Sequence, residues 1–297
     1  MGRELAIIRS GEAEPAPETY RAALRDVIRR CVYAADKNPL AIDLCKVALW
    51  IEGHSPGLPL SFLDHRIRCG DSLVGVFDLD VLKAGVPDEA FKPLTGDDKA
   101  VCAELRRINR RDRGGELAKF SAEGILTELA GEFAALADMP DETPGDVRSK
   151  EELYGQLKES DRVARLRHAC DAWTAAFFAA HRPGQERTAP TTADVWNALA
   201  ARENPQRAAL IDELSDQFHF FHWRLEFPEV FAHGGFNVML GNPPWERLTI
   251  IDQQYFSLVP QIADEQNAKK RQEEISRYLT SLRWTPSVRQ PEPRLKV

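Results

Sequence analysis

The pattern that most constrains the fold of this sequence is a strand-like run, a helical pattern and a second strand-like run. The first run, residues 31–35, is rich in strand-forming residues and ends at Asp36. Pro39 then opens a helical pattern that we expect over about residues 40–52, followed by the second run at residues 66–69. A strand–helix–strand unit predicts a parallel sheet.

A second informative pattern is the apolar run at residues 236–240, which we expect to be a buried strand, followed by Asn242-Pro243-Pro244-Trp245. The prolines stiffen this turn and carry no N–H, so it presents mainly acceptors, the Asn242 side-chain oxygen and the Pro243 carbonyl. Two acceptors can take both hydrogens of an exocyclic amine and direct its lone pair toward a methyl donor. Trp245 offers a flat face on which an extruded base can stack. The alternative is a plain proline turn with Trp245 in the core, but the motif is rare by chance, which favours the catalytic interpretation.

Acidic residues follow both predicted strands near the N-terminus. Asp36 follows the first, and Asp71 follows the second within Gly70-Asp71-Ser72-Leu73. In nucleotide-binding sheets, an acidic residue at a strand end accepts hydrogen bonds from ribose hydroxyls. Each is also explained by a turn or a helix start, since Asp-x-Asn-Pro is a good cap. Their order, with the proline motif after them, favours a nucleotide site.

Composition excludes few functions. The hydrophobic content of 43% and charged content of 29% are ordinary for a soluble protein, and no apolar stretch approaches membrane-spanning length. The net charge of −7 gives no bulk support for DNA binding, although a local basic face would suffice. The five cysteines form no Cys-x-x-Cys pair, which indicates reduced thiols in a cytoplasmic protein, neither a disulfide frame nor a zinc site.

The middle of the chain differs in texture from both ends. Residues 97–215 are charged amphipathic segments that we expect to form several antiparallel helices outside the sheet, so that Asp71 and Asn242 meet in space. Strand-like sequence resumes at residues 220–227, and the tail after Arg283 is expected to be poorly ordered. The first helical segment carries a basic cluster, which we interpret as a solvated helix face in preference to a DNA contact: Arg106, Arg107, Arg110, Arg111 and Arg113.

These motifs resemble the adenine-N6 DNA methyltransferases of large type II restriction–modification and related phage-defence systems. The likeness covers roughly residues 15–80 and 215–260, including Asp36-Lys37-Asn38-Pro39-Leu40-Ala41, Ile67-Arg68-Cys69-Gly70-Asp71-Ser72-Leu73 and Phe221-His222-Trp223. It implies an α/β fold, an incomplete Rossmann-like S-adenosylmethionine-dependent core with a large helical insertion. The implied parts are a partial core at 15–80, the insertion at 97–215, a core segment with the catalytic loop at 216–260, and a helix with a tail at 261–297.

The resemblance also implies a site and its ligands. Asp36, with Asn38 beside it, would hold the ribose of S-adenosylmethionine, and Asp71 would contact its adenine amino group. The partner would be double-stranded DNA with a flipped adenine, and the transfer requires no metal. The remaining implied residues are Ser72 and Leu73, which would line the cofactor pocket, and Asn242, Pro243, Pro244 and Trp245, which would be catalytic. A metal site built from His219, His222 and His233 is disfavoured, because their spacing is loose.

One departure from the family pattern leaves an alternative open. The family begins its catalytic domain with an Asp-x-x-x-Gly-x-Gly loop, whereas this sequence contains no Gly-x-Gly. We therefore expect an internal, truncated piece of a longer enzyme, and the alternative is a non-catalytic remnant or split subunit that binds DNA or a partner. A nicotinamide-dependent oxidoreductase is a weaker alternative, since it lacks its own glycine fingerprint and leaves the proline motif unexplained.

Overall fold

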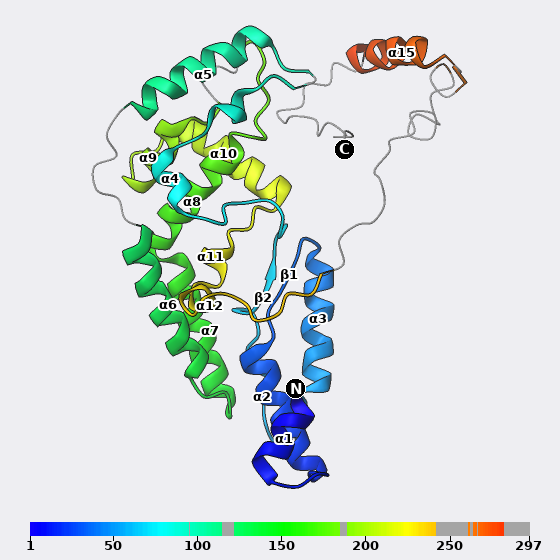
Figure 1. Cartoon of the computed structure of the whole chain (residues 1–297), viewed down its shortest axis with the longest axis vertical. Coiled ribbons are helices and arrows are strands. Elements are labelled where there is room, and N and C mark those ends of the chain that lie inside the picture. Colours follow the sequence, from blue (N-terminus) through cyan, green and yellow to red (C-terminus); the bar gives the residue numbers. More distant parts are fainter. Residues whose placement is uncertain are drawn as a thin grey trace.

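The computed structural model describes residues 1–94, 96–114, 122–184, 189–241, 261, 264–265 and 267–281. These residues form a mostly helical α/β structure that contains a short parallel sheet (Figure 1). Its elements, in chain order, are α1 (Gly2–Ser10), α2 (Pro17–Cys31), β1 (Ala34–Asp36), α3 (Pro39–Glu52), β2 (Ile67–Cys69), α4 (Asp80–Ala84), η1 (Asp88–Phe91), α5 (Lys99–Arg113), α6 (Ala122–Asp138), α7 (Pro144–Glu159), α8 (Asp161–Ala175), α9 (Thr192–Leu199), α10 (Pro205–Phe218), α11 (Trp223–Glu226), α12 (Pro228–Ala232) and α15 (Ala268–Ser281).

The predicted strand–helix–strand unit is present as β1, α3 and β2. The two strands pair in parallel, with Asp36 opposite Cys69. Asn38 caps α3, because its side-chain oxygen accepts a hydrogen bond from the Leu40 N–H at 3.0 Å, and Pro39 occupies the first turn, where no donor is needed. The prediction of a parallel pair of strands joined by a helix is confirmed; the described part of the chain adds no third strand to this sheet.

The middle of the chain is helical, as its amphipathic pattern predicts, whereas its division from a core as an insertion stays a prediction. Helix α8 is central, and helices α5, α9 and α10 contribute to the same hydrophobic cluster. Helices α6 and α7 form a second cluster, and α2, α3 and β2 share a third. Members of the main cluster, around α8, include Val101, Leu105, Leu166, Ala169, Val195 and Leu214.

None of the described helices combines the length and apolar character that crossing a membrane requires.

A buried ion network joins the helices to the sheet. The Glu226 carboxylate lies 3.3 Å from Arg68 Nε of β2 and accepts a hydrogen bond from Arg167 Nη1 of α8 at 2.7 Å. Burial alone would raise the pKa of Glu226, but the two guanidinium groups outweigh it and lower this pKa to about 2. Glu226 therefore stays charged and ties three separate parts of the chain together.

The strand predicted at residues 220–227 is wrong. Only Phe220 pairs in a strand-like manner, through an isolated parallel bridge to Asp71, and the chain then turns into α11. The reason is that the His222 carbonyl accepts hydrogen bonds from the Leu225 and Glu226 N–H groups, at 2.8 and 2.9 Å, so the backbone enters a helical turn. Its aromatic residues instead pack around one another, with the Phe221 and Trp223 ring centroids 5.1 Å apart.

The buried strand predicted at residues 236–240 is also wrong. This segment is not a strand, and Val238, Met239 and Leu240 are 72%, 68% and 94% exposed. An apolar run becomes a buried strand only when a neighbouring strand accepts its hydrogen bonds and other elements cover its side chains. Among the residues that the structure describes, no strand pairs with this run, and Phe236, which packs against Tyr33 and Trp223, is the member whose side chain other elements cover.

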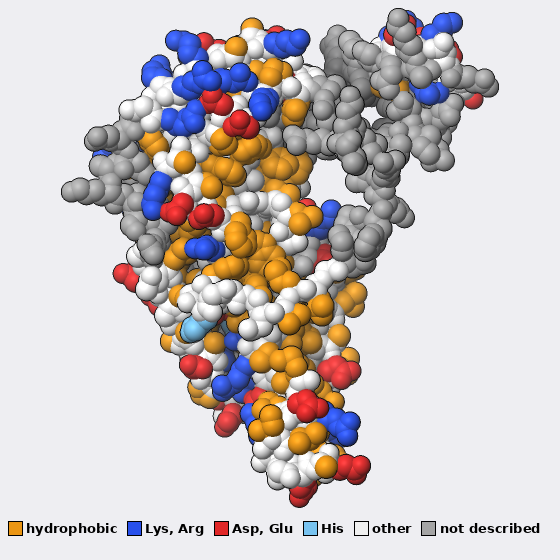
Figure 2. Space-filling model, viewed as in Figure 1, with side chains coloured by type: hydrophobic (Ala, Val, Ile, Leu, Met, Phe, Trp, Pro, Cys, Tyr) orange, Lys and Arg blue, Asp and Glu red, His pale blue; other side chains and the backbone are white. Residues whose placement is uncertain are grey.

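Helix α3 has an apolar face on the surface. Leu40, Leu44, Val47 and Ile51, spaced three or four residues apart, are between 45% and 70% exposed. Hydrophobic side chains also gather on the visible surface around this part of the fold (Figure 2). An exposed stripe of this kind is typical of a surface that contacts another polypeptide.

Candidate cofactor site

Asp36 and Asp71 lie at the same edge of the sheet. Asp36 is the last residue of β1, and the Gly70 N–H donates to its carbonyl at 2.9 Å. Asp71 follows Gly70, two residues after the end of β2 at Cys69. Because β1 and β2 are parallel neighbours, the acidic residues that sequence reasoning selected follow adjacent strand ends, where α/β sheets bind nucleotides.

Both carboxylates are oriented by short turns. Asp36 Oδ1 accepts a hydrogen bond from the Asn38 N–H at 2.7 Å, and Asp71 Oδ1 accepts one from the Leu73 N–H at 3.1 Å. Such turns stiffen the backbone and fix the side-chain direction. Asp36 is exposed and Asp71 is half-buried, so both carboxylates are accessible to a ligand in the folded state.

Ser72 and Leu73 complete this edge. The Ser72 carbonyl accepts a hydrogen bond from Trp223 Nε1 at 2.9 Å, which anchors the turn to α11. Leu73 is 84% exposed, so an apolar surface stands beside the Asp71 carboxylate. A carboxylate next to an exposed aliphatic side chain suits a flat heterocycle that carries an amino group.

Gly75 allows the loop after β2 to approach the backbone at Phe221 closely. Its φ is 156°, and a Cβ there would collide with the Phe221 carbonyl oxygen. The Phe221 N–H donates to the Val74 carbonyl at 2.8 Å, so the two segments run side by side. Sequence reasoning did not select Gly75, although the glycine pair around Ser72–Val74 is the signal that could have found it.

The His222 side chain also holds the loop after β2 in place, because it bonds that loop on one side and helix α8 on the other. Its Nδ1 accepts from the Val76 N–H, so its Nε2 carries the proton and donates to Asp171 Oδ1 at 2.9 Å. Asp171 also accepts a hydrogen bond from Ser215 Oγ at 3.1 Å. Both ring nitrogens of His222 therefore have protein partners. His233 is held separately, with its Nδ1 2.8 Å from the Glu229 carbonyl oxygen.

A pocket of about 320 Å³ lies between the sheet unit and the helices, and its lining includes Cys69 and Phe220 but not Asp36, Asp71 or Leu73. Burial, followed by the nearby Arg167 and Arg68, lowers the pKa of Lys158 on its wall. The cofactor candidates therefore stand at an open edge beside this pocket and do not line it. Lining residues include Ile42, Lys46, Arg68, Tyr154, Lys158, Arg167 and Glu226.

The basic cluster of α5 faces its own acidic neighbours. Arg110 and Arg113 both bind Asp88 of η1, and Arg107 binds Glu104 one turn earlier on the same helix. Figure 2 shows the basic side chains at the top of the view, over α5. These pairings agree with the interpretation of a solvated helix face.

The catalytic candidates Asn242, Pro243, Pro244 and Trp245 lie outside the described residues, as do the residues after position 281. Their roles, and the meeting of Asn242 with Asp71, stay predictions.

Comparison with known proteins identifies the class of the chain. A family model of the Eco57I restriction-modification methylases matches residues 30–280, and the chain belongs to this family. Over 242 residues the chain is 22% identical to a Methanocaldococcus jannaschii protein named as a type II restriction enzyme and methyltransferase. That alignment covers 75% of this chain and 18% of the relative, so the chain spans less than a fifth of that protein's length. No solved structure matches the chain.

Proposed function

We propose that this chain takes part in DNA adenine-N6 methylation with S-adenosylmethionine, as part of a restriction–modification or phage-defence enzyme. The single observation that carries the proposal is Asn242-Pro243-Pro244-Trp245 in a member of a restriction-modification methylase family. The adjacent strand ends at Asp36 and Asp71 support it, since they form the kind of edge at which α/β sheets bind nucleotides.

The hydrogen-bond acceptors at this edge fit part of the proposed cofactor. Asp36 would accept hydrogen bonds from the ribose hydroxyls, and Asp71 would accept one from the adenine amino group, with Leu73 against the ring. Asn38 holds the Asp36 carboxylate through its N–H and would act by positioning it. When bound, the cofactor supplies an electrophilic methyl group.

The catalytic loop would act on the substrate amine. Asn242 Oδ1 and the Pro243 carbonyl would accept its two hydrogens, which leaves the nitrogen lone pair free to attack the methyl group. Pro244 would keep the turn stiff, and Trp245 would stack on the flipped adenine. A nitrogen nucleophile oriented in this way needs no covalent enzyme intermediate.

A second candidate function is that of a split subunit that binds a partner polypeptide. The exposed apolar face of α3 and the exposed residues 238–240 favour it, because both offer apolar surface for another chain segment to cover. The open edge of β1, which pairs only with β2 among the described strands, could accept a further parallel strand. The two candidates are compatible if the partner completes the methyltransferase.

The base that becomes methylated tests the proposal. The gene would be expressed with its native neighbours in a host without adenine methylation, and digested host DNA would be analysed by mass spectrometry. We expect N6-methyladenine, lost in cells that carry Asn242→Ala. Finding N4-methylcytosine would overturn the adenine assignment. Finding no new methylated base would reject the methyltransferase proposal in favour of the split subunit that binds a partner polypeptide.

A further inference from the structure

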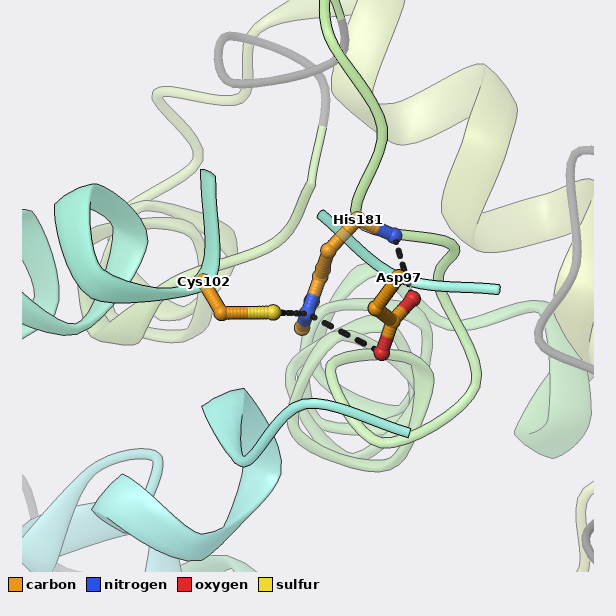
Figure 3. Close-up of side chains that lie close together, drawn as sticks. All are labelled: Asp97, Cys102 and His181. Carbon is orange, nitrogen blue, oxygen red and sulfur yellow. Dashed lines mark hydrogen bonds and ion pairs between the residues drawn. The ribbon is translucent and has the colours of Figure 1, made fainter. Parts of the chain in front are cut away.

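Three potential metal ligands, Asp97, Cys102 and His181, converge in the helical part of the chain (Figure 3). Asp97 lies in the loop before α5, Cys102 lies in the first turn of α5, and His181 follows α8. His181 and Cys102 are 0% and 1% exposed, and the Asp97 side chain is 3% exposed. A thiol, an imidazole and a carboxylate thus share one buried place.

The spacing of their atoms is that of ligands around a single cation. Cys102 Sγ lies 3.3 Å from His181 Nδ1, and this nitrogen lies 3.9 Å from Asp97 Oδ2. All three ligand atoms are within 4.8 Å of one another. Tetrahedral zinc with ordinary bond lengths separates sulfur, nitrogen and oxygen ligands by roughly 3.4–3.6 Å. Small side-chain adjustments would therefore place the three atoms around one ion.

The ring orientation favours a cation over a catalytic relay. In a Cys–His–Asp relay, one ring nitrogen of histidine faces the thiol and the other faces the carboxylate. Here Nδ1 of His181 faces both Cys102 and Asp97. One nitrogen can make only one hydrogen bond, whereas a cation bound to it can also bind the sulfur and the carboxylate oxygen.

The backbone holds these ligands in place before any ion binds. Asp97 Oδ1 accepts a hydrogen bond from the His181 N–H, and Asp97 Oδ2 accepts one from the Leu94 N–H, both at 3.0 Å. In return, the Asp98 N–H donates to the His181 carbonyl at 2.8 Å. The Asp98 carboxylate caps α5, which leaves Asp97 as the acidic residue that faces inward. Rigid support of this kind is what metal sites require.

We propose that Asp97, Cys102 and His181 bind one Zn²⁺, with a further donor completing the tetrahedron. Thiolate and imidazole select zinc over magnesium or calcium, and binding would release the Cys102 proton to solvent. The ion would cross-link the start of α5 to the segment that follows α8. Its role would be structural, and the proposed methyl transfer does not depend on it. No Cys-x-x-Cys motif reveals this site, because its ligands come from separate segments.

Metal analysis of the purified full chain, without a histidine tag, tests this proposal. Mass spectrometry should find about one zinc per chain in the wild type and an at least tenfold loss in Cys102→Ser. Serine can keep the hydrogen bond to His181 but is a poor zinc ligand, so a network without metal would tolerate it. Cys170→Ser, at another fully buried cysteine, is the matched control and should retain zinc.

Two measurements on the wild type keep the proposal testable if a variant does not fold. Replacing zinc with Co²⁺ should give the thiolate-to-cobalt absorption of a tetrahedral site. Adding a chelator should lower the melting temperature, because an ion that binds only the folded state stabilises it. A wild-type chain that retains no zinc, gives no such absorption with Co²⁺ and melts unchanged with chelator would overturn the proposal.

Discussion

Removal of the Glu226 carboxylate should strongly destabilise the chain. This carboxylate is 8% exposed and balances Arg68, whose side chain is 7% exposed, as well as the partly buried Arg167. Breaking a buried pair leaves an uncompensated charge, so Glu226→Ala should lower the free energy of unfolding by about 3–5 kcal/mol. The pKa gives a similar magnitude, since a fall from 4.5 to about 2 corresponds to about 3 kcal/mol.

Urea unfolding at neutral pH, followed by circular dichroism, measures this loss. Glu104→Ala is the matched control, because the Glu104–Arg107 pair is exposed to solvent and its loss should leave the free energy of unfolding close to that of the wild type. A cost below about 1 kcal/mol for Glu226→Ala would refute the view that this network holds the helices to the sheet.

The same network predicts a dependence on pH. The folded-state pKa of Glu226 lies below its ordinary value of 4.5, so the carboxylate stabilises the fold above that pH. Its contribution is lost as the pH falls from about 4.5 toward 2. The stability difference between the wild type and Glu226→Gln should therefore shrink over this range, and a constant difference would contradict the assigned charge.

Three further outcomes are expected. Gly75→Ala should lower the melting temperature, because its φ is 156° and the new Cβ meets the Phe221 carbonyl, whereas Gly131→Ala in α6, where a Cβ meets nothing within 4 Å, should leave it equal or higher; equal losses would contradict this. Calorimetry of the purified chain should show weak binding of S-adenosylmethionine at best, since the chain has no Gly-x-Gly to bring backbone donors close to the cofactor, and micromolar affinity would prove this wrong. In an active, complemented enzyme, Trp245→Ala should weaken capture of a flipped adenine by roughly 1–3 kcal/mol while Trp245→Phe stays mild, as judged by affinity for DNA with an unpaired target base.

The parts of the fold that sequence reasoning found are those with local signals. Asn38 and Pro39 specify the start of α3 by capping and by a missing donor, and the strands on either side follow from their composition. Asp36 and Asp71 then fall at one edge because parallel strands leave no other arrangement.

The parts that it missed depend on contacts between distant residues. The apolar run at 236–240 has the composition of a strand, but composition does not provide a neighbouring strand. Glu226 was similarly hidden, since its partners Arg68 and Arg167 are far from it in sequence. The cluster around His181 joins segments whose spacing matches no motif.

The most direct test of the central claim is the turnover of Asn242→Ala in a full-length or complemented, active enzyme. Removing an acceptor that works on the reacting amine should cost on the order of 10²–10³ in rate. Binding of S-adenosylmethionine should stay close to that of the wild type, because Asn242 would contact the substrate base and not the cofactor. Methylation of adenine at near wild-type turnover by Asn242→Ala would contradict the proposed function.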